Sequence, residues 1–203
     1  MRTLGNYILV SRTEMTKKDY IETILFILRK ILDYTSSLNQ ITPTLFDKKS
    51  YHNEKDDSDI STNASSKEDN SSNSLVDEED IFTLVDYLYF WVDKLEFDEN
   101  LLILTMMNID KILSKEFVLT SSNVKNVLFT CMVITQKYYE DENFCDKDYS
   151  KIINLKANEL INMEIEILSL MDFSLNITED EFNNYKNRMK NVWKNNLSFF
   201  TFT

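Results

Sequence analysis

The sequence predicts an all-α fold, a five-helix bundle around a buried third helix, with one more helix on its N-terminal side. Composition is the first reason: the 203 residues include only one glycine and one proline. β-Sheets usually need more of these residues for their tight turns. The second is periodicity, because apolar residues recur at three- and four-residue steps along most of the chain. The third is the segment 120–141, which is apolar on both faces and must therefore be enclosed by other helices.

The first helix is expected from Thr16 to about Tyr34. Thr16 and Asp19 have the spacing of a capping box, in which each side chain bonds the backbone amide of the other residue. An apolar stripe follows, made of Ile21, Ile24, Leu25, Leu28, Ile31 and Leu32. Residues 1–50 are therefore predicted to be an N-terminal helical segment that packs on the bundle.

Residues 51–76 are predicted to be a disordered acidic insertion within one domain. They are rich in serine, asparagine and aspartate, and they contain too few apolar side chains to offset the entropy lost on ordering. Two interpretations stay open for the serines beside acidic residues: they are phosphorylated, or the segment is a solvated loop with no such role.

The bundle is expected to follow the insertion. The predicted helices cover residues 77–95, 98–115, 120–141 and 157–171, with a last helix from residue 178 and a short helical turn around Tyr149. Asp77 and Asp98 can cap the first two helices, and the hydroxyl groups of residues 120–122 can cap the third. Thr178 and Glu181 make a second capping box at the start of the last helix.

Charge and hydropathy exclude several classes of partner. The net charge of -12 argues against sequence-independent binding to nucleic acid or anionic lipid, since both need lysine and arginine to neutralise phosphates. No apolar run approaches the length of a membrane span or of a signal-peptide core. Cys131 and Cys145 do not form a disulfide framework, so we expect reduced thiols and a nuclear or cytoplasmic protein.

The residue inventory also argues against an enzyme. The single histidine, His52, lies in the insertion, so histidine-activated nucleophiles and histidine-ligated metals are not expected. Gly5 is the single glycine, so no phosphate-cradling loop is expected either. The acid–base alternatives are pairs of carboxylates, Glu140 with Asp141 and Glu164 with Glu166. The sequence therefore predicts a non-catalytic protein without cofactor or metal, whose partners are proteins.

Four segments, in order, resemble successive parts of a cyclin box. They are LVDYL from Leu84, NIDKIL from Asn108, LTSSNVKNVLFTCMVITQKYYED from Leu119 and ELINMEIEILSLMDFSLNIT from Glu159. The chain is most similar to P/U-type cyclins of the phosphate-signalling group. The resemblance implies a single cyclin box over residues 77–197. Beyond it, residues 198–203 form an aromatic tail that either covers the domain or meets a partner.

The resemblance also implies a function. Cyclins bind a cyclin-dependent protein kinase and hold its mobile αC helix in the active position, without making or breaking a bond themselves. A regulatory subunit in a heterodimer with such a kinase is therefore expected. The alternative is a cyclin-fold scaffold or adaptor that works without a kinase.

Lys137 and Glu164 match the lysine and glutamate with which cyclins hydrogen-bond the kinase backbone. Each charge lies beside an apolar stripe and needs a partner. The alternative is that Lys137 extends into water and Glu164 pairs within the bundle. The apolar positions that match the kinase-facing patch of cyclins are Tyr138, Leu168, Phe173 and Leu175, for which core packing is the alternative.

The chain departs from mitotic cyclins in the first helix of the box. Residues 80–83 replace the motif that forms a substrate-docking groove, so docking of arginine-containing motifs is not expected. Ile81 stands in place of the arginine that pairs with the aspartate matched by Asp110. Asp110, a structural residue in the family, is therefore expected to pair with Lys111 or with a group of the kinase.

Two other positions depart from the P/U-type pattern. Phe90 stands where these cyclins usually carry an arginine, and Ile153 with Asn154 stands where they carry a glycine pair. Asparagine tolerates the left-handed backbone conformation better than most residues, so Asn154 can still adopt the conformation that a glycine would.

Overall fold

The computed structural model describes residues 14–37, 78–115 and 117–200 of the chain, and within these ranges every regular element is an α-helix. The helices are α1 (Lys17–Ser36), α2 (Glu78–Lys94), α3 (Glu99–Leu113), α4 (Val124–Tyr139), α5 (Asp146–Ile153), α6 (Ala157–Leu170) and α7 (Glu179–Phe200). The predicted all-α fold is confirmed, while the predicted insertion at 51–76 lies outside the described residues. None of the described helices has the length and apolar character that a bilayer span requires.

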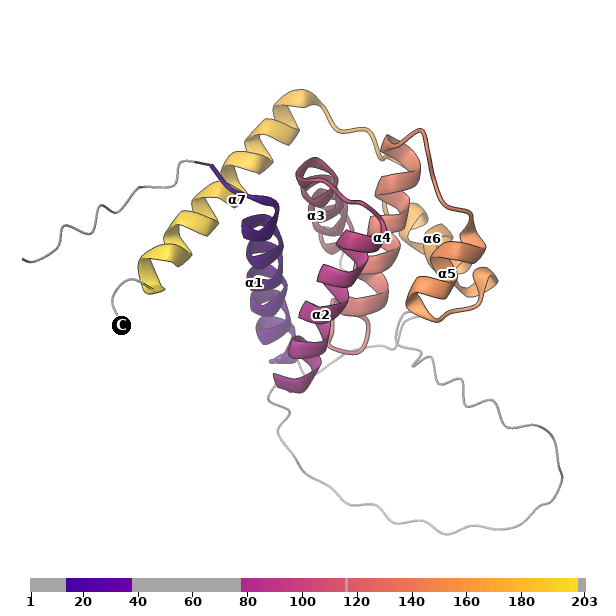
Figure 1. Cartoon of the computed structure of the whole chain (residues 1–203), viewed down its shortest axis with the longest axis horizontal. Coiled ribbons are helices and arrows are strands. Elements are labelled where there is room, and N and C mark those ends of the chain that lie inside the picture. The colour runs from indigo at the N-terminus through magenta and orange to yellow at the C-terminus, as the bar shows by residue number, and fades with distance from the viewer. Residues whose placement is uncertain (1–13, 38–77, 116, 201–203) are drawn as a thin grey trace, which may run out of the picture.

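The helix α4 is the enclosed centre of the bundle (Figure 1). It packs against α3, α5 and α6, and Phe129 meets Trp91 of α2 edge to face with 4.9 Å between ring centroids. Every residue from Asn126 to Gln136 is buried. The predicted enclosure of this helix is therefore confirmed.

Two buried polar side chains of α4 are bonded to groups outside that helix. The hydroxyl of Thr135 accepts a hydrogen bond from Nδ2 of Asn108 on α3 at 3.1 Å, and Nε2 of Gln136 donates to the carbonyl of Leu95 at 2.8 Å. Because a buried polar group without a partner is costly, these bonds define how α4 sits against α3 and the end of α2.

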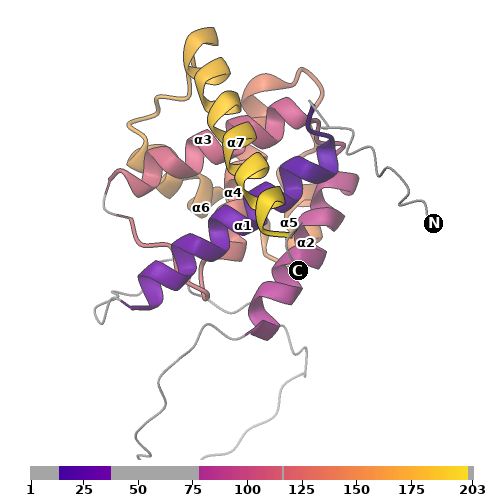
Figure 2. The same cartoon turned by 90° about the vertical axis from the view of Figure 1, so that its left-hand side faces the viewer.

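The helices α1 and α7 cross on one face of the bundle, where both pack against α3 (Figure 2). The predicted stripe of α1 has its most buried members at Ile21, Ile24, Leu28 and Leu32. The buried stripe of α7 consists of Tyr185, Met189 and Trp193. The helix α7 continues to Phe200, past the predicted start of the tail at residue 198.

Most predicted helix starts are confirmed by their caps. The Thr16–Asp19 box is formed, Asp98 accepts from the amide of Leu101 at 2.8 Å, and Glu181 accepts from the amide of Thr178 at 2.8 Å. The predicted cap at Asp77 lies outside the described residues.

The predicted start of the central helix at Thr120 is wrong. Residues 121–123 form a turn, and α4 begins only after Asn123, whose side chain does not cap it. Instead, Asn123 accepts from the amide of Thr120 at 2.8 Å and donates to the carbonyl of Val118 at 3.0 Å. The asparagine side chain thus stabilises the turn that precedes the helix, and the first helical residue is Val124.

Asn154 ends α5 in the left-handed conformation, with φ 59° and ψ 48°. Asn154 thus adopts the conformation that the sequence allows it at a position expected to favour glycine. The backbone reverses there, so α6 returns along α5 and reaches α4.

Candidate functional site

The charged centre of the site is a cluster of three side chains from three helices. Lys137 lies in the last turn of α4, Asp146 begins α5, and Glu164 lies in the middle of α6. Nζ of Lys137 is 2.9 and 2.8 Å from the two carboxylate oxygens of Glu164, and it also donates to Oδ1 of Asp146. The structure thus brings Lys137 and Glu164 together, and the pairing of Glu164 within the bundle, one alternative from the sequence, is observed.

Asp146 is a member of this cluster that the sequence does not signal. It belongs to a short, polar helix with no feature that distinguishes it from other acidic residues. It reaches Lys137 only because α5 folds back against α4. A partner brought in by tertiary packing leaves no local pattern in the sequence.

Burial and pairing shift the pKa values within the cluster. Glu164 is 8% exposed; burial raises the pKa of its carboxyl group, and the bond from Lys137 offsets only part of that rise. Burial alone would lower the pKa of Lys137, but hydrogen bonds to Asp146 and Glu164 outweigh it and raise that pKa. Lys137 is therefore a fixed cation whose ammonium protons point at carboxylate oxygens.

The predicted apolar positions differ in how deeply they are buried. Tyr138 is 50% exposed and Phe173 is 65% exposed. Leu168 and Leu175 are half-buried and pack against the core. The Leu168 carbonyl accepts from the amide of Phe173 at 2.8 Å, and the Leu175 carbonyl accepts from the hydroxyl of Tyr139 at 2.9 Å. Core packing thus describes the two leucines, whereas Tyr138 and Phe173 present aromatic rings to solvent.

Phe144 is a further exposed ring that the sequence does not mark. It is 41% exposed and packs edge to face on Tyr149, with 5.6 Å between ring centroids. Tyr149 is fully buried, burial raises its pKa to about 12, and its ring lies 5.5 Å from Nζ of Lys137. Phe144 therefore lies near the charged cluster, although it is outside every helix.

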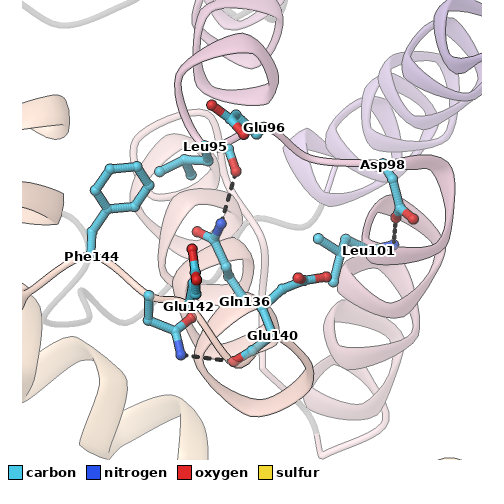
Figure 3. Close-up of a pocket in the computed structure, with 9 residues that line it drawn as sticks. Leu95, Glu96, Asp98, Leu101, Gln136, Glu140, Glu142 and Phe144 are labelled. Carbon is cyan, nitrogen blue, oxygen red and sulfur yellow. Dashed lines mark hydrogen bonds between the residues drawn. The ribbon is translucent and has the colours of Figure 1, made fainter.

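We call the surface formed by Lys137, Glu164, Tyr138, Phe144 and Phe173 the α4–α6 patch. An acidic groove of about 570 Å³ adjoins it, and Phe144 lines both (Figure 3). The carboxylates around the groove are those of Glu96, Asp98, Glu140 and Glu142, and no lysine or arginine lines it. A partner that covers Phe144 therefore also meets a negative surface.

No metal site is evident in the described part of the chain, where no three histidine, cysteine or acidic side chains are grouped to hold an ion.

Asp110 lies apart from the patch and joins α3 to α7. Its Oδ2 accepts a hydrogen bond from the hydroxyl of Tyr185 at 2.8 Å. Burial raises the pKa of Asp110, and the bond from Tyr185 offsets part of that rise. The expected pairing with Lys111 is wrong, because adjacent residues on a helix point in different directions and Lys111 bonds backbone carbonyls after α6.

A family model for the cyclin N-terminal domain matches residues 50–176, which is more than half of the chain. The chain belongs to the cyclin family. In this cyclin, the match covers α2 to α6 and every residue of the α4–α6 patch, whereas α1 and α7 lie outside it.

Sequence relatives place this cyclin with the P/U-type group. It is 35% identical to Cyclin-U2-1 of Arabidopsis thaliana over 69 residues, which is 34% of this chain and 31% of the relative. It is 32% identical to Cyclin-P2-1 of Oryza sativa subsp. japonica over 65 residues, 32% of this chain and 30% of the relative. PHO85 cyclin-7 of Saccharomyces cerevisiae is 30% identical over 77 residues, 38% of this chain and 27% of the relative. The matched stretches thus span less than a third of each relative.

Proposed function

We propose that this cyclin binds a cyclin-dependent protein kinase through the α4–α6 patch and acts as its regulatory, non-catalytic subunit in a heterodimer. Membership of the cyclin family supports the proposal, as do two relatives from Saccharomyces cerevisiae that are named PHO85 cyclin-7 and PHO85 cyclin-6. The observation that carries it is the Lys137–Glu164 pair, which bridges α4 and α6 beside exposed aromatic rings. We further propose that the complex works in the nucleus, the cytoplasm or both.

The proposed mechanism is a shift in the conformation of the kinase. A protein kinase is active when its αC helix is docked so that its lysine–glutamate ion pair can close. A cyclin that binds this conformation more tightly than the inactive one moves the equilibrium toward it. A shift from 1:99 to 99:1 takes roughly 5.5 kcal/mol of differential binding. A single ion pair does not supply that much, so the apolar part of the patch must contribute to the interface.

The charged cluster is suited to bonding a peptide backbone. Lys137 directs its protons at Glu164 and Asp146, while the carboxylates have lone pairs left to accept from backbone amides. Asp146 is the more exposed of the two acids, with 41% of its side chain accessible against 11% for Glu164. An approaching carbonyl can therefore replace Asp146 on Lys137, while Glu164 keeps the lysine in place and accepts an amide proton.

The direct test is co-purification followed by an activity assay. The tagged cyclin is mixed with a panel of cyclin-dependent kinases that includes PHO85, and phosphotransfer is measured with and without the cyclin. We expect a stoichiometric complex and a higher rate with at least one kinase. If a kinase binds but is not activated, it remains the partner and the regulatory role is overturned. If no kinase of the panel co-purifies with the cyclin, the scaffold alternative is favoured.

The site itself is tested by reversing the ion pair, with Lys137→Glu combined with Glu164→Lys. The reversed pair retains opposite charges but presents them to the kinase backbone with the wrong sign, and Asp146 then faces a like charge. We expect loss of kinase binding with unchanged helical content, measured by calorimetry and circular dichroism.

The matched control reverses an exposed pair on α1, Lys18→Glu with Glu22→Lys, whose charged atoms lie 3.6 Å apart. It should bind as the wild type does. Wild-type affinity in the Lys137–Glu164 reversal would remove both positions from the interface.

A further inference from the structure

The α6–α7 linker, residues 171–178, holds two non-glycine residues in an unfavourable backbone conformation. Asp172 and Phe173 have φ values of 52° and 55°. The left-handed region is rarely occupied by residues with a side chain, and a bulky residue there is an outlier. Phe173 is also 65% exposed. An unfavourable backbone and an exposed aromatic ring thus coincide at one residue, so other contacts must hold it.

Side chains from α3 and α4 supply these contacts. Nζ of Lys111 donates to the carbonyls of Ser174 and Asn176, at 3.1 and 3.4 Å. On the other side of the linker, the hydroxyl of Tyr139 donates to the carbonyl of Leu175 at 2.9 Å. The backbone on the C-terminal side of Phe173 is therefore tied down by two helices, while the Phe173 ring is left facing outward.

A third contact comes from Lys115, whose Nζ lies 2.9 Å from Oδ2 of Asp172. Both side chains are largely exposed, and exposed ion pairs contribute little to conformational stability. Lys111 differs, because it is partly desolvated and burial lowers its pKa. It also bonds two carbonyls that no helix amide satisfies, so it is the stronger tether.

We propose that Lys111 and Tyr139 are positioning residues that hold the α6–α7 linker in the conformation that presents Phe173 to the kinase. The inference rests on the proposed function and adds residues that lie outside the α4–α6 patch. Its physical basis is preorganisation: a linker already held in its binding conformation loses less entropy when a partner covers it.

The first arm of the test needs no kinase. Amide hydrogen exchange is measured in the free full-length protein for wild type, Lys111→Met and Tyr139→Phe. Both variants should exchange the amides of Phe173 and Ser174, which donate to the carbonyls of Leu168 and Met171, at least about tenfold faster, while amides in the buried part of α4 stay protected. Lys194→Met is the control, because it removes a positive charge from an exposed position on α7. Unchanged exchange of the Phe173 and Ser174 amides would overturn the proposal.

The second arm measures affinity for the kinase that the wild-type cyclin binds, in a double-mutant cycle with Phe173→Ala. Lys111→Met should weaken binding about five- to tenfold in the wild-type background and less than about twofold when Phe173 is absent. Tyr139→Phe, which removes a single hydroxyl group, should behave in the same way. Equal losses in both backgrounds would show that Lys111 acts through its charge or through the fold, and would overturn the proposal.

The two arms separate the possible failures. If the wild-type cyclin binds no kinase of the panel, the proposed function fails, and presentation of Phe173 to a kinase fails with it. Hydrogen exchange then still decides whether Lys111 holds the linker. If the wild type binds and the cycle shows no coupling, the proposed function stands and the positioning role alone is overturned.

Discussion

At the scale of single residues, the Lys137–Glu164 pair stands out because its two members have different environments. Glu164 is almost fully buried on α6, whereas Lys137 keeps 29% of its side chain accessible and has a second carboxylate partner. Burial of the glutamate outweighs the attraction of one lysine, so its ionised form is destabilised in the folded chain. Hydrogen-bond donors from a partner, such as the backbone amides of a docked kinase, would stabilise the ionised form of this carboxylate.

This environment predicts how stability depends on pH. The pKa of Glu164 in the folded chain is raised above the ordinary glutamate value of 4.5, so at a pH between 4.5 and the folded-state pKa the folded chain holds a proton that the unfolded chain has lost. The unfolded state binds fewer protons in that window, and the free energy of unfolding therefore falls as pH rises through it. Glu164→Gln cannot titrate there. The stability of wild type relative to Glu164→Gln should thus decline with rising pH, measured by urea unfolding from about pH 4 to pH 7. A relative stability that increases over this range would mean that the bond from Lys137 outweighs burial.

At the scale of elements, α7 is joined to α3 by a partly buried polar contact, between the buried Tyr185 and the exposed Asp110, as well as by apolar packing. Tyr185 donates to Asp110 at 2.8 Å, and the guanidinium group of Arg188 lies 4.7 Å from the Tyr185 ring centroid. In this chain Ile81 replaces the arginine that the resemblance leads one to expect opposite Asp110. A tyrosine from another helix satisfies the carboxylate instead.

We predict that Tyr185→Phe destabilises the protein by about 0.5–1.5 kcal/mol, because it removes the hydrogen bond to Asp110, a carboxylate exposed enough for water to replace the lost donor. Adding Asp110→Asn should recover part of the loss, since a neutral amide is less costly to desolvate in part than a carboxylate. The measurement is urea unfolding followed by circular dichroism. Tyr34→Phe, at a 67% exposed position on α1, is the matched control and should change stability by less than about 0.5 kcal/mol. A Tyr185→Phe variant as stable as this control would show that the hydrogen bond contributes nothing to the α3–α7 contact.

At the scale of the whole molecule, the enclosed helix α4 makes the bundle cooperative. It packs on α3, α5 and α6, so no part of its buried surface can be exposed without separating several helices. Cys131 lies in this helix and is fully buried, whereas Cys145 precedes α5 and is exposed. The two thiols therefore report separately on the surface and on global unfolding.

We predict that a thiol reagent modifies Cys145 rapidly in the native protein and Cys131 only when the bundle opens. Burial raises the pKa of Cys131, which lowers the thiolate fraction and adds to the steric protection. The expected count is one reactive thiol in buffer and two in denaturant, measured by absorbance. The variant Cys145→Ser isolates the slow reaction, whose rate should rise with denaturant as global unfolding does. Rapid labelling of this variant in buffer would mean that α4 is reached through local opening.

Some expectations from the sequence depended on contacts that local patterns do not encode. The start of α4 is such a case, because Asn123 bonds the preceding turn rather than the helix. The partner of Asp110 is another: adjacency in sequence suggested Lys111, but the helix turns the two side chains apart. In contrast, the left-handed backbone conformation of Asn154 depends on the residue type and on the short chain reversal around it, so the sequence showed that it was allowed.

The sequence by itself determined the helices, the caps of α1, α3 and α7 and the enclosure of α4, because periodicity and capping act within a few residues of one another. It also placed Lys137 and Glu164 on helices that a cyclin box brings together. Only the tertiary structure decided which charges meet: Asp146 joins Lys137, Tyr185 satisfies Asp110, and Lys111 ties the α6–α7 linker. These partners come from other helices, or from a helix and the linker beyond it, so the bonds depend on how the elements pack and leave no periodic signal along the chain.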